Sequence, residues 1–304
     1  MFFKNLTLFR FSPETAGKLK KLEAKLAEHA LRPCGPLEMA TRGWISPYGR
    51  NEEDLMHSHG RYRLVTLGGE DKILPMATVN QYVADKAAAI EAERGRPVGA
   101  RERRKLKEDA LTDLMPRALT RPSRIASYVD LDDGWMIIDT SSRKQAENVV
   151  SQLRETLGSF PAVQAEAEES PRALMTEWLI EAKLPEGFEL GDEIELKDPA
   201  DRGAIVKCRR QDLASEEIRE HLKCGKQVTQ LAIVYRERLS FVLDELLTVR
   251  KFKLLDLAVE SLESGDRESA RAELDARFAL MVLEVNQLLG DLEKTFAVHR
   301  PAGK

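Results

Sequence analysis

Strand-like segments that follow one another without an intervening helix are the feature that most restricts the fold of this chain. β-branched and other apolar residues dominate the stretch from Gln227 to Lys253 (QVTQLAIVYRERLSFVLDELLTVRKFK), which predicts several strands in succession. Arg124 to Asp139 predicts two more strands around an Asp-Gly turn. Because strands and helices do not alternate in regular βα units, the sequence favours an α+β fold with antiparallel sheets over a doubly wound parallel sheet.

Helical periodicity adds longer helices to these strands. Thr78 to Glu93 and Ala100 to Met115 are predicted to form a helical hairpin that is polar enough to project from the body. A capping box at Ser142 and Gln145 predicts the start of another helix. The apolar stripe from Phe278 to Phe296 predicts a long C-terminal helix, and we interpret it as core packing, with a dimer seam as the alternative.

Three parts are expected in the chain. Residues 1–76 together with 116–165 form a central α+β domain, and residues 77–115 form a projecting basic helical arm. Residues 166–304 form a C-terminal α+β domain that contains an acidic connector and the long terminal helix.

Charge is unevenly distributed, although the net charge is only −4. Residues 94–124 contain ten Arg or Lys and four Asp or Glu, whereas residues 166–201 contain twelve acids and three bases. This segregation favours a face or arm that meets an anionic partner. The acidic block is interpreted as a solvated surface, with an outward-facing role in repelling stray nucleic acid as the alternative.

The cysteines and the apolar segments indicate a cytoplasmic protein that does not enter a membrane. Cys34, Cys208 and Cys224 are far apart, odd in number and without metal-ligand spacing, so neither a disulfide framework nor a zinc site is predicted. The N-terminus MFFKNLTLFRF is interrupted by charged residues and lacks a cleavage site, which argues against a signal peptide. No apolar run approaches the roughly 18 residues of a membrane-spanning helix.

Catalytic signatures are absent from the sequence, so no enzyme is predicted. There is no GxGxxG or GxSxG motif, and no pair of acids has a recognisable nuclease or glycosidase arrangement. His57 and His59 form an HxH after three acids, but without a third placed ligand we interpret it as a polar loop and predict neither metal nor cofactor. A metal-dependent DNA-processing enzyme that uses these groups is kept as an alternative function.

The stretch LMPRALTRPSR, Leu114 to Arg124, combines prolines with arginines. Pro116 and Pro122 predict an open, irregular backbone, and the arginines have no acid within the stretch to pair with. KCRRQ, Lys207 to Gln211, is basic and lacks local acidic partners in the same way, and Arg250, Lys251 and Lys253 form a further basic group. Guanidinium groups bind phosphate through charge-assisted hydrogen bonds, so these clusters are candidate contacts for a nucleic-acid backbone.

Several long strings in the chain resemble the RdgC family of recombination-associated bacterial nucleoid proteins. They are collinear from residue 2 to about residue 255 and include FKNLTLFRF, RPCGPLEM, DKILP, LMPRAL, SSRKQAENVVSQLRETLGSFP, MTEW and VKCRRQDLASEEIREHLKCGKQVTQLAIVYRERLSFVLDE. The resemblance implies a non-enzymatic, sequence-nonspecific DNA-binding protein that forms a ring-shaped homodimer around double-stranded DNA, with single-stranded DNA as a further ligand to consider. It also implies association with the nucleoid and a functional link to the recombinase RecA, whose access to DNA the family limits.

A ring of this kind requires an extended subunit. A compact globule of 304 residues would have a radius of gyration of only about 19 Å, so encircling a duplex calls for an arched chain made of several small subdomains. A direct interaction with the recombinase through the acidic block is the alternative to an effect through DNA.

The resemblance also indicates which residues face DNA. Arg117 in MPRAL and Arg210 and Gln211 in RRQD match the family's DNA-facing motifs, and charge and proximity add Arg121, Lys207 and Arg209. Leu119 stands where the family commonly has Phe. It is a candidate interface residue or DNA wedge, but Leu packs without the stacking that an aromatic ring provides.

Overall fold

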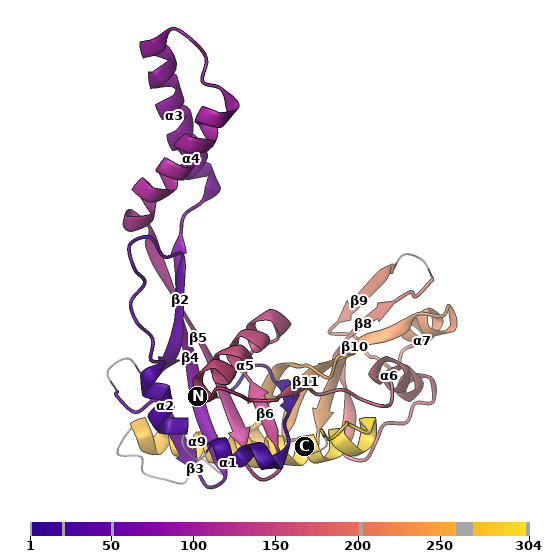
Figure 1. Cartoon of the computed structure of the whole chain (residues 1–304). Helices are drawn as coiled ribbons and strands as arrows, with labels where there is room; N and C mark the ends of the chain where they lie inside the picture. Colours follow the sequence, from indigo (N-terminus) through magenta and orange to yellow (C-terminus); the bar gives the residue numbers. More distant parts are fainter. Residues whose placement is uncertain (1, 20–21, 50–51, 201–202, 260–269, 302–304) are drawn as a thin grey trace.

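The computed structural model describes residues 2–19, 22–49, 52–200, 203–259 and 270–301. The strands form two sheets, and every strand pairing within them is antiparallel. The prediction of a mixed fold with antiparallel sheets is therefore confirmed (Figure 1). No helix among the described residues is long and apolar enough to cross a membrane.

The first sheet has seven strands in the order β2-β4-β5-β6-β1-β7, with β3 also paired to β4. Its strands are β1 (Thr7–Arg10), β2 (Ala40–Ile45), β3 (Met56–His59), β4 (Tyr62–Ile73), β5 (Leu119–Asp130), β6 (Trp135–Ile138) and β7 (Val163–Gln164). The turn between β5 and β6 contains Gly134 with φ 69°, in agreement with the predicted Asp-Gly turn.

Helices α1 (Ala16–Leu19), α2 (Leu22–Glu28) and α5 (Arg143–Leu157) pack against one face of this sheet. α5 forms as the capping signals predict, because the Ser142 side chain accepts a hydrogen bond from the Gln145 amide and Gly158 ends the helix in a left-handed conformation. Its apolar residues Ala146, Val149, Val150, Leu153 and Leu157 are buried in the core beneath the sheet.

β4 and β5 form a twelve-residue ribbon that carries the helical arm. The arm consists of α3 (Met76–Arg94) and α4 (Ala100–Leu114), followed by the short 3₁₀ turn η2 (Met115–Arg117), and it projects from the body as predicted (Figure 1). The ribbon pairs Tyr62 with Asp130 at its base and Ile73 with Leu119 at its outer end.

The backbone between Leu119 and Arg124 is a strand, so the predicted irregular backbone is wrong there. Pro122 is accommodated because β6 pairs with β5 only from Ser127 onwards, which leaves the outer half of β5 as an edge. On that side the Ala126 carbonyl accepts from the Asp139 amide. In a strand, residues an even number of positions apart direct their backbone groups to the same side, so the nitrogen of Pro122 points to the same side as the Ala126 carbonyl. At Pro122 this side is the open edge, and no hydrogen bond of the sheet is lost there.

The second sheet has the order β12-β11-β10-β8-β9. Its elements are β8 (Phe188–Lys197), β9 (Ile205–Arg209), β10 (Gln227–Tyr235), β11 (Leu239–Asp244) and β12 (Val249–Leu254), with α6 (Pro171–Ile180), α7 (Glu216–Lys223) and the short α8 (Asp256–Val259). A helix is predicted from about Arg172 to Ala182, and α6 confirms it. The acidic connector predicted to follow this helix is wrong in part, because β8 lies within it. The sequence did not indicate β8, because acids occupy its outward positions and few apolar residues, such as Ile194 and Leu196, face the core.

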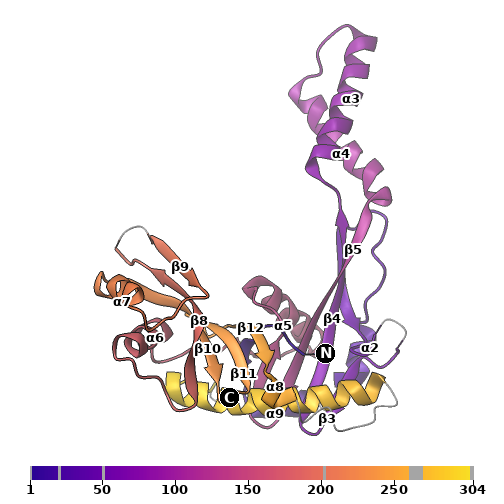
Figure 2. The ribbon, with the colours of Figure 1, turned by 180° about the vertical axis from the view of Figure 1, so that it is seen from behind.

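Helix α9 (Ala270–Phe296) runs beneath both sheets (Figures 1 and 2). Near its start Phe278 packs on Tyr128 of the first sheet, and near its end Phe296 packs on Trp178 of α6. The apolar stripe predicted from the sequence is buried within the chain, which confirms the core interpretation. At 27 residues α9 is about 40 Å long, and it ties the two sheets into one core.

Candidate nucleic-acid interface

The predicted DNA-facing residues fall into two groups on different parts of the molecule. Arg117, Leu119 and Arg121 lie where the β4–β5 ribbon joins the arm, and Lys207, Arg209, Arg210 and Gln211 lie on β9 and directly after it. The arm and the β8–β9 end of the second sheet rise on the same side of α9, which gives the subunit an open, concave outline (Figures 1 and 2).

The backbone of η2 sets the position of Arg117 at the arm base, and no ion pair with a described residue contributes. Arg117 is the last residue of η2, and the Lys72 ammonium donates to the Met115 carbonyl at the start of that turn, 2.9 Å away. The side chains of Arg117 and Arg121 are exposed and have no hydrogen bond or ion pair with any described residue. Two guanidinium groups are therefore available to an external anion.

Leu119 is one of several exposed apolar residues on the segments that meet at the arm base. Its side chain is 77% exposed, and its cross-strand neighbour Ile73 is also exposed. The Lys72 amide donates to the Met39 carbonyl, which brings a second exposed segment alongside. We use the name arm-base patch for the five exposed apolar residues on these segments, Leu37, Met39, Ile73, Met76 and Leu119, of which Ile73 and Leu119 are paired across the ribbon.

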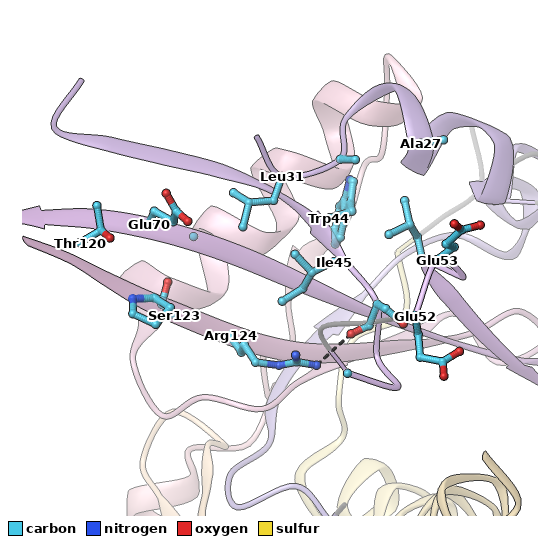
Figure 3. A pocket seen from close by; sticks show the side chains of 16 residues that line it. Ala27, Leu31, Trp44, Ile45, Glu52, Glu53, Glu70, Thr120, Ser123 and Arg124 are labelled. Atoms are coloured by element: carbon cyan, nitrogen blue, oxygen red, sulfur yellow. Dashed lines mark hydrogen bonds between the residues drawn. The ribbon is translucent and has the colours of Figure 1, made fainter. Parts of the chain in front are cut away.

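A pocket beside the ribbon has the wrong charge for phosphate. Its floor is apolar and includes Leu31, Trp44 and Ile45, and three acids and one arginine lie around it (Figure 3). These charged residues are Glu52, Glu53, Glu70 and Arg124. Arg124 donates to the Ser46 carbonyl at 2.9 Å and is thus engaged within the chain. We therefore exclude this pocket from the candidate interface.

The second group lies on the exposed face of the five-stranded sheet. In β9 Val206 and Cys208 pack toward the core, so Lys207 and Arg209 point outward. The core face of this sheet carries α6, α7 and the end of α9, and α6 and α7 lie on the side away from the arm (Figures 1 and 2). The charged face is therefore the one turned toward the arm.

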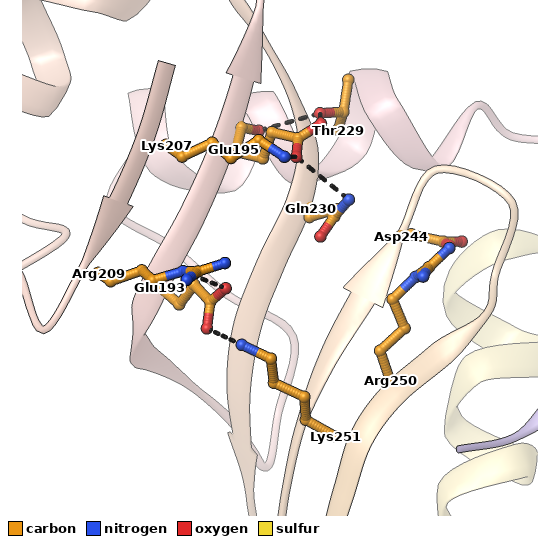
Figure 4. A network of polar contacts seen from close by, with 9 residues as sticks. All are labelled: Glu193, Glu195, Lys207, Arg209, Thr229, Gln230, Asp244, Arg250 and Lys251. Carbon is orange, nitrogen blue, oxygen red and sulfur yellow. Dashed lines mark hydrogen bonds and ion pairs between the residues drawn. The ribbon is translucent and has the colours of Figure 1, made fainter. Parts of the chain in front are cut away.

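Lys207 and Arg209 do have acidic partners, which corrects the prediction that they lack them. Lys207 Nζ lies 2.7 Å from Glu195, and Arg209 Nε lies 3.2 Å from Glu193 (Figure 4). Both acids come from β8, so this part of the acidic block shares a face with the cations instead of lying on a separate outer surface. Burial favours the neutral form of Glu193, but Lys251 and Arg209 outweigh it and lower the pKa of its carboxyl.

A β-bulge in β12 adds two cations to this face. Val249 and Phe252 are both buried, so the two residues between them, Arg250 and Lys251, both point outward. Lys251 has φ 53°, and the register between β11 and β12 shifts at this point. Arg250 bonds to Asp244 at 2.9 Å and Lys251 to Glu193. The spacing of the apolar residues, three instead of two, was the sequence signal for the bulge.

Arg210 and Gln211 lie just beyond β9. Arg210 has a left-handed backbone with φ 52°, and its exposed side chain has no partner among the described residues. Gln211 is held by its amide, which donates to the Asp192 carbonyl, and by its side chain, which donates to Glu217. An unusual backbone conformation at an unpaired arginine is typical of a functional position.

The HxH pair is part of the packing between β3 and α9. His57 lies 2.8 Å from the Tyr48 hydroxyl, and both His57 and His59 lie within 3.2 Å of Asp275. Burial lowers the pKa of His57. Within the described part of the chain no group of three or more His, Cys, Asp or Glu residues could hold a metal ion.

Comparison with known proteins identifies the family. The family model described as "Putative exonuclease, RdgC" matches residues 1–299. The chain belongs to the RdgC family. Proteins named "Recombination-associated protein RdgC" from Xanthomonas campestris pv. campestris, Xanthomonas axonopodis pv. citri and Xylella fastidiosa are 50%, 48% and 47% identical to it. Each match covers 96% of this chain and 97% of the relative.

RdgC membership implies a role in recombination for this chain. The RdgC relatives carry names that state this association and no catalytic activity, whereas the description of the family model names an exonuclease.

Proposed function

We propose that this protein binds DNA without sequence preference and acts in recombination by enclosing duplex DNA in a homodimeric ring, which limits access of RecA. The observation that carries the proposal is a set of three exposed arginines that have no partner among the described residues. Arg117 and Arg121 lie on one side of a concave subunit and Arg210 on the other (Figure 1). Nucleoid association follows from such binding, and no cofactor is required.

Sequence-blind binding follows from the type of group that these elements present. Arginine and lysine side chains on strands and turns match phosphate, which is the same at every base pair. The cations of the sheet face project from strands, and Gln230, the amide side chain drawn beside them, donates to Glu195 (Figure 4). The affinity should therefore depend strongly on salt and weakly on base sequence.

Closure of the ring requires contacts between two copies, and the arm-base patch supports such a contact. Exposed apolar side chains that cluster are typical of protein interfaces. Leu119 is the most exposed of the five, so it would meet the partner first and pack without stacking. The arm would then reach across the duplex while α9 forms the outer side of each half-ring (Figure 2).

Topological enclosure is tested by comparing closed circular and linear duplex DNA of the same sequence. We expect the protein, loaded at low salt, to stay on the circle in high salt and to leave the linear form through its ends. DNA retention on immobilised protein is the measurement. Equal release of the two forms would refute enclosure while leaving DNA binding intact.

The family description also names an exonuclease, so degradation is the second function to test. Incubation with end-labelled linear duplex and single-stranded DNA in Mg²⁺ or Mn²⁺ is expected to release no labelled nucleotide. A product that EDTA abolishes, and that a His57→Ala, Asp275→Asn variant no longer forms, would favour the enzyme instead.

A further inference from the structure

The charged face of the five-stranded sheet has two levels. The side chains of Lys207, Arg209 and Lys251 are 56%, 67% and 56% exposed. Those of Glu193 and Glu195 are only 20% and 14% exposed. The head groups of the cations thus lie outermost, and the carboxylates lie closer to the strands (Figure 4). An approaching phosphate would meet cations that already have an anionic partner.

Glu193 and Glu195 differ in the hydrogen-bond donors that they keep when their cations bind a phosphate instead. Glu195 also accepts hydrogen bonds from the Thr229 hydroxyl at 3.1 Å and the Gln230 amide at 3.3 Å. Release of Lys207 would therefore leave Glu195 with two donors. Glu193 is bonded only to Arg209 and Lys251 among the described residues. Their release would leave a partly buried carboxylate without a partner among the described residues, which is unfavourable.

We propose that Glu193 is a built-in competitor of DNA phosphate, which holds Arg209 and Lys251 until the nucleic acid displaces it. This inference rests on the proposed function and specifies how its binding face is regulated. Phosphate must replace an existing charge-assisted bond, so the net gain at each of these cations is small. Glu195 competes in the same way for Lys207, but less strongly because Thr229 and Gln230 stabilise its free state.

Such competition suits a protein that encloses its ligand. A closed ring retains DNA by topology, so strong individual phosphate contacts are unnecessary and would slow movement along the duplex. A carboxylate beneath the cations shortens the lifetime of each contact between a cation and a phosphate, because the cation can return to the carboxylate. The cations keep their steering effect on DNA, since their head groups remain outermost.

Glu193→Gln tests the proposal, and Glu189→Gln is its matched control. Glu189 lies on the same strand, and its exposed side chain has no hydrogen bond or ion pair with any described residue. Both variants therefore remove one negative charge from β8. We expect Glu193→Gln to bind linear duplex about three- to tenfold more tightly than Glu189→Gln at moderate salt. The slope of log K against log salt should steepen by up to about 0.9 for each cation freed. Glu195→Gln should give a smaller gain.

Equal affinities of the Glu193→Gln and Glu189→Gln variants would overturn the inference. If the wild type itself failed to bind DNA, the proposed function would fail instead, so the two failures are distinguishable. A double-mutant cycle that combines Lys251→Met with Glu193→Gln gives a second test of the proposal by DNA affinity. Loss of Lys251 should reduce affinity more in the Glu193→Gln background than in the wild type, and equal losses would contradict competition.

Discussion

Replacing Phe278 with alanine is expected to lower the free energy of unfolding by about 3–5 kcal/mol. Phe278 is 1% exposed and lies at the point where α9 meets the first sheet. Its ring centroid is 5.6 Å from that of Tyr128, 5.4 Å from His57 and 6.5 Å from Tyr62, all in edge-to-face geometry. Truncation would remove these contacts and leave a cavity that a sheet and a helix cannot easily close.

Equilibrium denaturation in urea measures this effect, with Leu283→Ala as the control. Leu283 lies on the same helix and is 56% exposed, so its truncation should change the free energy of unfolding by less than about 0.5 kcal/mol. Equal destabilisation by the two substitutions would mean that α9 is not anchored through Phe278. Because α9 contacts both sheets, a single unfolding transition is expected in either variant.

Arg117→Ala combined with Arg210→Ala is expected to weaken binding to any duplex sequence by about ten- to a hundredfold at moderate salt. Neither arginine has a partner within the described chain, so removing them leaves no buried acid unpaired and the fold should be unaffected. The magnitude of the slope of log K against log salt should fall by about 0.9 per lost phosphate contact. Titration at several salt concentrations, on two unrelated sequences, gives both quantities.

The matched control is Arg219→Ala with Lys294→Ala. It removes the same charge from α7 and α9, on the other side of the charged sheet. An unchanged slope in the Arg117, Arg210 variant, or the same loss in the control, would mean that only net charge matters. The arginine variant also separates the two routes, through DNA or through direct contact, of the proposed action on RecA. If it still inhibits filament assembly at full strength, a direct protein contact replaces the effect through DNA.

Local signals were sufficient to predict α5, the β5–β6 turn, the arm and the buried stripe of α9. Each depends on residues close together in sequence, such as the Ser142 cap or apolar residues at helical spacing. The register of β8 and the ion pairs of the charged face were not predictable in this way. Glu193 and Lys251 are 58 positions apart, and only the strand order β12-β11-β10-β8 places their side chains on one face of one sheet.

The sequence therefore predicted only part of the candidate site. The sequence indicated the basic segments, because arginine and lysine are visible without a fold. It could not indicate which of them are neutralised, since that depends on partners from another strand. The same long-range pairing distinguishes Arg209, which is paired with Glu193, from its neighbour Arg210, whose side chain has no partner in the described part of the chain.

The position of Pro122 has a consequence for the behaviour of the protein at high concentration. A long ribbon with an open edge offers unpaired amides to the edge of another molecule, which is how strands nucleate ordered aggregates. Pro122 contributes no amide at the middle of that edge, and Arg121 and Arg124 on either side add like charges. The chain can thus extend its arm far from the body while remaining protected against edge-to-edge polymerisation.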